Sequence, residues 1–159
     1  MQKIDVFSDH GTVSKSAIEG FEKEIGFCFP QEYKILISNH NGLSTVQDSF
    51  DFTNQFGETE EGGIRFYGYG GWPVESIEDS QDFDIYGHDG IVSFGRRGNG
   101  DHICFDYRHD PKTCEPRIVL MLHDEYTEDT EGNAKHLLID IAPNFEAFID
   151  MLYKYEDDE

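Results

Sequence analysis

Residues 91–107, IVSFGRRGNGDHICFDY, decide the fold. Two apolar runs, residues 91–94 and 102–107, flank a glycine-rich connection that contains Asn99-Gly100. Asn-Gly is the strongest short-range signal for a tight turn between antiparallel strands. The second run alternates between apolar side chains (Ile103, Phe105, Tyr107) and more polar ones (His102, Cys104, Asp106). The alternation predicts a β-hairpin whose second strand has one apolar and one polar face.

The chain after this hairpin predicts two further strands and a helix. Residues 117–122 form a nearly continuous apolar run, which is typical of a strand in the middle of a sheet. A polar loop over residues 124–135 leads to another strand over residues 136–141. Residues 145–153 then place their apolar side chains on one helical face, with Pro143 near the first turn.

Two helices are predicted before the hairpin. Ser16 begins a capping box, and Gly26 supplies the left-handed end of the helix that follows it. Pro30 suits the first turn of a second helix, which ends at Asn41-Gly42. Residues 43–90 lack helical spacing, and their glycine clusters and recurring aromatic residues predict short strands joined by loops.

The predicted elements are segregated by type, with two helices first, then strands, then a helix. Segregation predicts an α+β fold and not alternating parallel βαβ units. We expect a single domain over residues 1–159, with its core at about 14–153 and an acidic tail at 156–159. The central sheet should be mainly antiparallel, with two N-terminal helices and one C-terminal helix. Residues 3–7 fit an edge strand or a coil.

The charge restricts the partners. The chain has 33 acidic and 12 basic residues, a net charge of −21. Nucleic acids and anionic membranes are bound through Lys and Arg, so neither is an expected partner. A basic protein is favoured by long-range attraction, although on composition alone solubility is the better explanation of the charge. The longest apolar run is too short to span a membrane and no secretory signal is visible, so we expect a cytoplasmic protein.

Motifs for metals, cofactors and catalysis are weak. Cys28, Cys104 and Cys114 are odd in number and include no CxxC pair, so we expect reduced thiols, and the histidines show no zinc spacing. We therefore expect no catalytic residue, no metal and no cofactor. A small enzyme that uses Cys104 or a carboxylate is an alternative, because His102, Cys104 and Asp106 share one strand face. The polar face of a half-buried strand gives the same pattern.

The candidate partner-binding surface lies within residues 44–90. This stretch carries eleven acidic residues against one basic residue, Arg65, and so holds about half of the net charge. Its aromatic residues fit either core packing or the centre of a protein interface. The candidate binding residues are Asp48, Asp51, Glu60, Glu61, Tyr69, Trp72, Glu75, Glu78, Asp79, Asp82, Asp84 and Asp89.

Several segments together resemble the SUKH superfamily, which includes fungal cell-wall-assembly regulators and many bacterial immunity proteins. The segments are Ile18 and Glu22, FPQEYK at 29–34, Asn41-Gly42, the strand at 91–94, Asp101, Asp106, and NFEAFI at 144–149. Phe29 and Asn144 stand where the family usually has Leu and Ser, and they keep the apolar and capping roles.

The resemblance implies a non-enzymatic immunity protein that binds a cognate secreted toxin, often a nuclease, and blocks it stoichiometrically. A nuclease needs a basic substrate channel, so a strongly acidic inhibitor would be attracted to it. A regulatory or scaffold role, as in the fungal relatives, is the alternative. The sequence does not indicate the oligomeric state.

Overall fold

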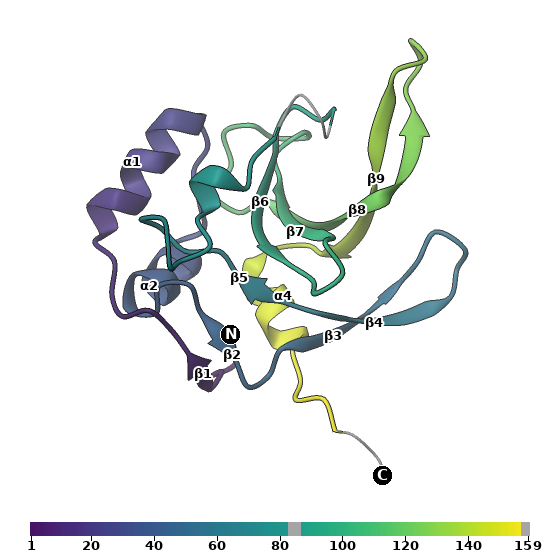
Figure 1. The fold of residues 1–159 in the computed structure, drawn as a ribbon. Coiled ribbons are helices and arrows are strands. Elements are labelled where there is room, and N and C mark those ends of the chain that lie inside the picture. The colour runs from purple at the N-terminus through teal and green to yellow at the C-terminus, as the bar shows by residue number, and fades with distance from the viewer. Residues whose placement is uncertain (83–86, 157–159) are drawn as a thin grey trace.

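The computed structural model describes residues 1–82 and 87–156, in which a short strand and two helices are followed by eight strands and a final helix (Figure 1). The helices are α1 (Lys15–Ile25), α2 (Gln31–Asn39) and α4 (Phe145–Met151), with a 3-10 turn, η1, at Ile77–Asp79. The strands are β1 (Val6–Ser8), β2 (Ser44–Thr45), β3 (Ser49–Thr53), β4 (Thr59–Gly63), β5 (Arg65–Phe66), β6 (Ile91–Arg96), β7 (His102–Asp106), β8 (Arg117–Glu128) and β9 (Ala134–Ala142).

The central sheet has five antiparallel strands in the order β5-β6-β7-β8-β9. β6 and β7 form the predicted hairpin, and β8 lies inside the sheet as its apolar sequence predicts. Two small antiparallel sheets, β1–β2 and β3–β4, complete the fold. The α+β class and the antiparallel sheet are thus confirmed, and the short strand β1 (Val6–Ser8) overlaps only the end of residues 3–7.

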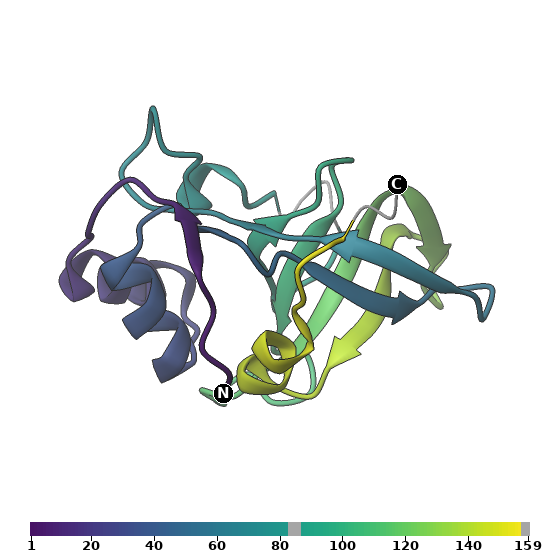
Figure 2. The same ribbon diagram turned by 90° about the horizontal axis from the view of Figure 1, so that it is seen from below.

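Aromatic side chains fill the core between the sheet and two helices. Phe94 of β6 stacks on Phe105 of β7 with ring centroids 4.2 Å apart. Tyr33 of α2 lies 5.2 Å from Phe105, and Phe145 of α4 lies 5.8 Å from Tyr33, between ring centroids. All four side chains are fully buried, so α2 and α4 cover the same face of the sheet. Figure 2 shows α1 and α2 at one end of the molecule and the β3–β4 hairpin at the other.

The helix ends follow local rules, with one correction. The N-cap of α1 is Ser14, whose side chain accepts a hydrogen bond from the Ala17 amide, so the capping box predicted at Ser16 is wrong. Gly26 ends the helix with φ of +80°, as predicted. Asn144 caps α4, which ends at Met151 because Tyr153 exchanges backbone hydrogen bonds with Ser49.

The polar face predicted for β7 is mostly buried. Cys104 is fully buried in a second apolar cluster with Ile91, Val119 and Met121. Asp106 is also buried, and its carboxylate accepts two hydrogen bonds from the Arg108 guanidinium. The sheet is therefore covered on both faces, which alternation along a single strand does not reveal.

The polar loop predicted over residues 124–135 is instead a hairpin arm, because β8 continues to Glu128 and β9 begins at Ala134. Figure 1 shows this β8–β9 arm projecting beyond the other strands of the sheet. Residues 123–128 are exposed, so this part of β8 has no face that packs against the core. Its sequence therefore lacks the alternation of apolar and polar residues that identifies a half-buried strand.

The expectation of reduced thiols is wrong for two of the three cysteines. Cys28, after α1, forms a disulfide with Cys114, in the loop before β8. The two residues are 86 positions apart, so the bond links the helical end of the chain to the sheet. Cys104 is the free cysteine. Motifs such as CxxC identify cysteines that are close in sequence. Cys28 and Cys114 are brought together only when the chain folds, so no such motif reveals their pairing.

We predict that the unfolded, unreduced protein exposes one reactive thiol and that the reduced protein exposes three. The reason is that only Cys104 is free, and its complete burial protects it until the chain unfolds. Mass spectrometry after alkylation in denaturant, with and without reductant, counts the labels. Three labels without reductant would contradict the disulfide, and Cys104→Ala is the control because it should remove the single unreduced label.

Candidate partner-binding surface

Eleven of the twelve candidate binding residues are described; Asp84 lies outside the described residues. They do not form one continuous surface. One group lies on or beside the β3–β4 hairpin: Asp48, Asp51, Glu60 and Glu61. A second group lies around η1: Tyr69, Trp72, Glu75, Glu78, Asp79 and Asp82. Asp89 lies just before β6, at the opposite end of that strand from Arg96.

The loop over residues 68–77, which we call the Trp72 loop, is anchored at its base. The buried Asn41 side chain accepts a hydrogen bond from the Tyr69 amide and donates one to the Tyr69 carbonyl. The Gly68 amide donates to the Glu75 carbonyl, and the Ile77 amide donates to the Gly68 carbonyl. Because these bonds satisfy the backbone at the base, the loop has one defined path.

The tip of this loop presents Trp72 to solvent. Its side chain is 95% exposed, and the Trp72–Pro73 peptide bond is cis. A tryptophan this exposed is unusual, because tryptophan side chains are highly buried on average. Trp72 is therefore accessible to a partner, whereas the sequence left core packing and an interface both open for it.

Tyr69 is not available in the same way, which corrects its place among the candidate binding residues. The side chain is only 3% exposed, and its hydroxyl lies 3.0 Å from the hydroxyl of Tyr33 in the core. Burial raises the pKa of both phenols, so both stay protonated. Tyr69 acts as a core residue that ties the Trp72 loop to α2.

The hairpin group brings two carboxylates together. Asp51 and Glu61 are directly opposite each other in the β3–β4 register. The hydroxyl oxygen of Tyr153 lies 2.7 Å from an oxygen of each, and its single proton is donated to one carboxylate at a time. Hydrogen bonds to Glu61 and Asp51 raise the pKa of Tyr153. Like charges opposite each other repel, so this hydroxyl stabilises a concentrated negative spot on the hairpin.

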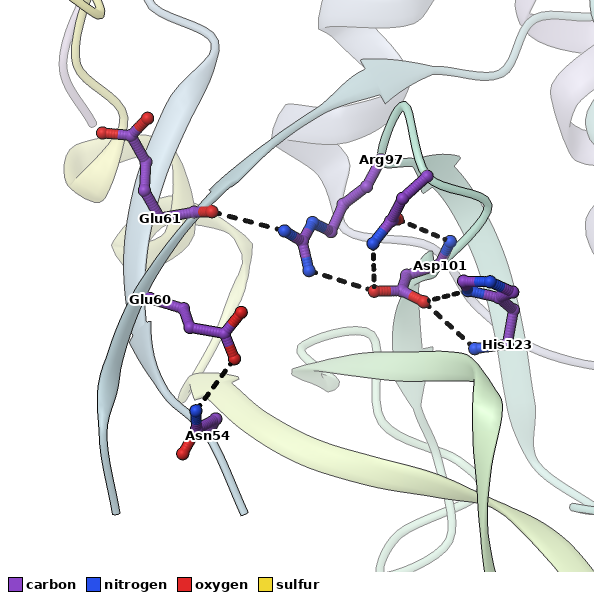
Figure 3. Close-up of polar contacts among 7 residues, drawn as sticks. Asn54, Glu60, Glu61, Arg97, Asp101 and His123 are labelled. Carbon is purple, nitrogen blue, oxygen red and sulfur yellow. Dashed lines mark hydrogen bonds and ion pairs between the residues drawn. The ribbon is translucent and has the colours of Figure 1, made fainter. Parts of the chain in front are cut away.

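Arg97 connects the hairpin group to the central sheet (Figure 3). Its guanidinium donates to the Glu61 carbonyl at 3.3 Å and to the Asp101 carboxylate at 3.0 Å, and it lies over the Phe52 ring. Asp101 also accepts hydrogen bonds from Asn99 and from the His123 backbone amide. Burial opposes ionisation of Asp101, but a side-chain hydrogen bond with His123, the two bonds just named and the Arg97 charge outweigh it and lower its pKa.

A basic seam, Arg65 and Arg96, separates the two acidic groups. The residues face each other in register across β5–β6. Both line one hollow that contains Asp48 of the hairpin group and a second hollow that contains Trp72 and Glu75. The counting of charge along the sequence missed this seam because Arg96 comes from a strand outside the acidic stretch.

The β8–β9 arm is a further acidic surface that sequence reasoning missed. Its exposed carboxylates are those of Asp124, Glu125, Glu128 and Glu131. The signal that could have located the arm is the Gly132-Asn133 pair between two polar runs, because glycine and asparagine favour turns. Gly132 indeed has φ of +81°.

The described residues offer little for catalysis or metal binding. Burial raises the pKa of the Cys104 thiol, which keeps it protonated and a poor nucleophile. Burial lowers the pKa of His102 to about 4, so this imidazole is neutral at pH 7. Asp101, His123 and Asp124 place one possible ligand atom each within 4.8 Å of one another. Asp101 is already paired with Arg97, which competes with a cation there. No helix among the described residues is long and apolar enough to cross a membrane.

Comparison with known families gives one match. Residues 12–151 match the model of the SMI1 / KNR4 family (SUKH-1), which covers most of the chain. Comparisons with curated proteins and with solved structures give no significant match.

We predict that Gly68→Ala destabilises the protein by about 1–3 kcal/mol, the usual cost of overpacking. A Cβ at this position would lie 2.5 Å from both Asn41 Oδ1 and Val74 Cγ1 and 2.7 Å from the Gly42 amide nitrogen. Urea unfolding measures the loss. Gly98→Ala is the matched control because a Cβ there meets no atom within 4 Å. Equal stability of the two variants would show that the Trp72 loop is not anchored in this way.

We predict that Asp101→Asn lowers stability at pH 7 by about 1–3 kcal/mol, because Arg97, Asn99 and His123 lose a charged, buried acceptor. The lowered pKa of Asp101 means that its stabilising effect is present above the unfolded pKa and is lost as pH falls through the folded value. The difference between native and variant in urea should therefore shrink below pH 3.8. A difference that is the same at pH 7 and pH 3 would contradict the ionic role, and Asp89→Asn, at an exposed site, is the control.

Proposed function

We propose that this chain, which belongs to the SMI1/KNR4 family (SUKH-1), is an immunity protein that binds a cognate toxin and blocks it without catalysis. The partner we propose is a basic protein, such as a nuclease, and the site of action is the cytoplasm of the producing cell. The observation that carries the proposal is the anchored Trp72 loop, which holds an almost fully exposed tryptophan beside exposed carboxylates.

Charge supports the basic character of the partner. The net charge is −21, and exposed carboxylates occur on the Trp72 loop, the β3–β4 hairpin and the β8–β9 arm. A field of one sign attracts an oppositely charged protein over distances of about 10 Å and raises its association rate. A toxin that acts on nucleic acid needs a positive surface, which is the surface this field would select.

The Trp72 loop supports a specific contact within that general attraction. Tryptophan is enriched among the residues that dominate binding energy, and a preformed loop loses little entropy when it binds. The hydrogen bonds from Asn41 and within the loop base supply this preorganisation. The carboxylates of Glu78 and Asp79, on η1 directly after the Trp72 loop, would add negative charge next to that loop.

We predict that Trp72→Ala hastens dissociation of the toxin by tenfold or more, a loss of about 1.4 kcal/mol or more, while association changes little. The physical reason is that packed contacts are lost without a change in charge. Surface plasmon resonance with the toxin from the adjacent gene measures both rates. Phe56→Ala, at an exposed phenylalanine in the β3–β4 turn, is the matched control. Equal effects of the two substitutions would place the interface elsewhere.

Three charge variants test which acidic surface contributes most to the rate of association with the toxin. Each replaces two exposed carboxylates by amides: Glu78 and Asp79 on η1, Glu58 and Glu60 on the hairpin, or Glu125 and Glu131 on the arm. All three change the net charge equally, so any common effect is the general field. The η1 variant should slow association most at low salt, and the difference should fall as salt rises. A larger effect of the arm or hairpin variant would contradict a binding face at the Trp72 loop.

A further inference from the structure

A cleft of about 380 Å³ lies beside Trp72, between the Trp72 loop, β5 and the β1–β2 strands. Its polar lining includes Arg65, Arg96, Glu75 and Ser44, and the side of Trp72 forms part of its apolar wall. The charge of this cleft is opposite to that of the protein as a whole. This volume is at the lower end of the range for ligand sites, which is roughly 300–1,000 Å³. It therefore suits a few side chains of a bound peptide.

The two arginines in the cleft differ in how they are neutralised. The Arg96 guanidinium forms an ion pair with Glu75 at 2.8 Å between Nε and Oε2. The contact found for Arg65 is a long hydrogen bond, 3.4 Å from its Nε to the Ser44 hydroxyl. Among residues 1–82 and 87–156, no carboxylate oxygen lies within 4.0 Å of the Arg65 side-chain nitrogens. With His10, which also lines the cleft, counted as neutral, two positive charges and one negative charge leave one positive charge.

This arrangement is unfavourable in the free protein. Arg65 and Arg96 are directly opposite each other in adjacent strands, and like charges in that position destabilise a sheet. The chain has 33 acidic residues that could have faced Arg65, yet the exposed guanidinium meets only a hydroxyl within the described residues. A carboxylate from outside would neutralise it, and the planar guanidinium can bind both carboxylate oxygens at once.

We propose that this cleft receives one acidic side chain of the protein partner, with the next apolar residue of that partner against Trp72. The proposal rests on the proposed function because it names what the toxin inserts beside the tryptophan. The toxin is basic as a whole, and the cleft would recognise one carboxylate on its surface. Other basic proteins without a carboxylate at that position would be attracted but not bound, which gives specificity beyond long-range attraction.

The charge of the cleft favours a carboxylate over a phosphate. One carboxylate balances the single positive charge, whereas a phosphate dianion would leave an excess negative charge beside Glu75 and in the field of a −21 protein. A nucleic acid would carry many such charges and would be repelled further. Trp72, Pro73 and Val74 form an apolar wall of the cleft. A free anion has no apolar group to pack against this wall, whereas a peptide has a neighbouring side chain that can do so.

The test uses Trp72 fluorescence, because this is the single tryptophan of the chain and it lines the cleft. The probe is the capped tripeptide acetyl-Leu-Glu-Leu-amide, and its glutamine analogue is the control. We expect saturable binding of the glutamate peptide with a Kd of ~1 mM and at least tenfold weaker binding of the analogue. Arg65→Gln should weaken binding by about fivefold or more, whereas Arg117→Gln, at an exposed arginine of β8, should not.

The melting temperature separates binding from a structural role of Arg65. Removing one of two facing positive charges should leave Tm unchanged or raise it, while a structural role predicts a lower Tm. Equal binding of the two peptides, tighter binding of inorganic phosphate than of the glutamate peptide, or no effect of Arg65→Gln would overturn the proposal. With the toxin, Arg65→Gln should hasten dissociation. If the native protein forms no toxin complex, the proposed function fails, and the peptide titration still decides whether the cleft binds a carboxylate.

Discussion

Tyr33 joins the core of the sheet to the loop that carries Trp72. Its ring packs against Phe94, Phe105 and Phe145, so it holds α2 and α4 on the same face of the sheet. Its hydroxyl meets that of Tyr69 inside the core. A buried hydroxyl without a partner costs about 1–3 kcal/mol, so each phenol depends on the other. This pair and Asn41 fix the base of the Trp72 loop. The fixed base holds Trp72 at the exposed tip.

The second constraint is the excess of negative charge. With 33 acidic residues and 12 basic ones, most carboxylates cannot have an ionic partner, and they gather on hairpins and loops where water screens them. The few basic residues are used at junctions. Arg97 fixes the β3–β4 hairpin to the sheet, and Arg108 neutralises the buried Asp106. Arg65 differs from these two arginines because it lines a cleft and has no ionic partner among the described residues.

The sequence predicts the elements that local chemistry determines. The turn at Asn99-Gly100, the end of α1 at Gly26 and the apolar face of α4 each depend on residues close in sequence, and each is found. Features that arise from long-range contacts were missed. The disulfide joins residues 86 positions apart, and the burial of Tyr69 depends on α2. The β8–β9 arm was missed because exposed strands carry no alternation.

The candidate partner-binding surface likewise combines features that the sequence predicts with features that depend on long-range contacts. Counting acidic residues identified an acidic stretch, but it could not show that Arg65 and Arg96 divide its carboxylates into two groups. Hydrogen exchange of the backbone amides, compared between the free protein and its toxin complex, tests the central claim most directly. We expect slower exchange in residues 68–77 and in β5, with little change in the β8–β9 arm. Slower exchange in the arm, with the Trp72 loop unchanged, would contradict the account.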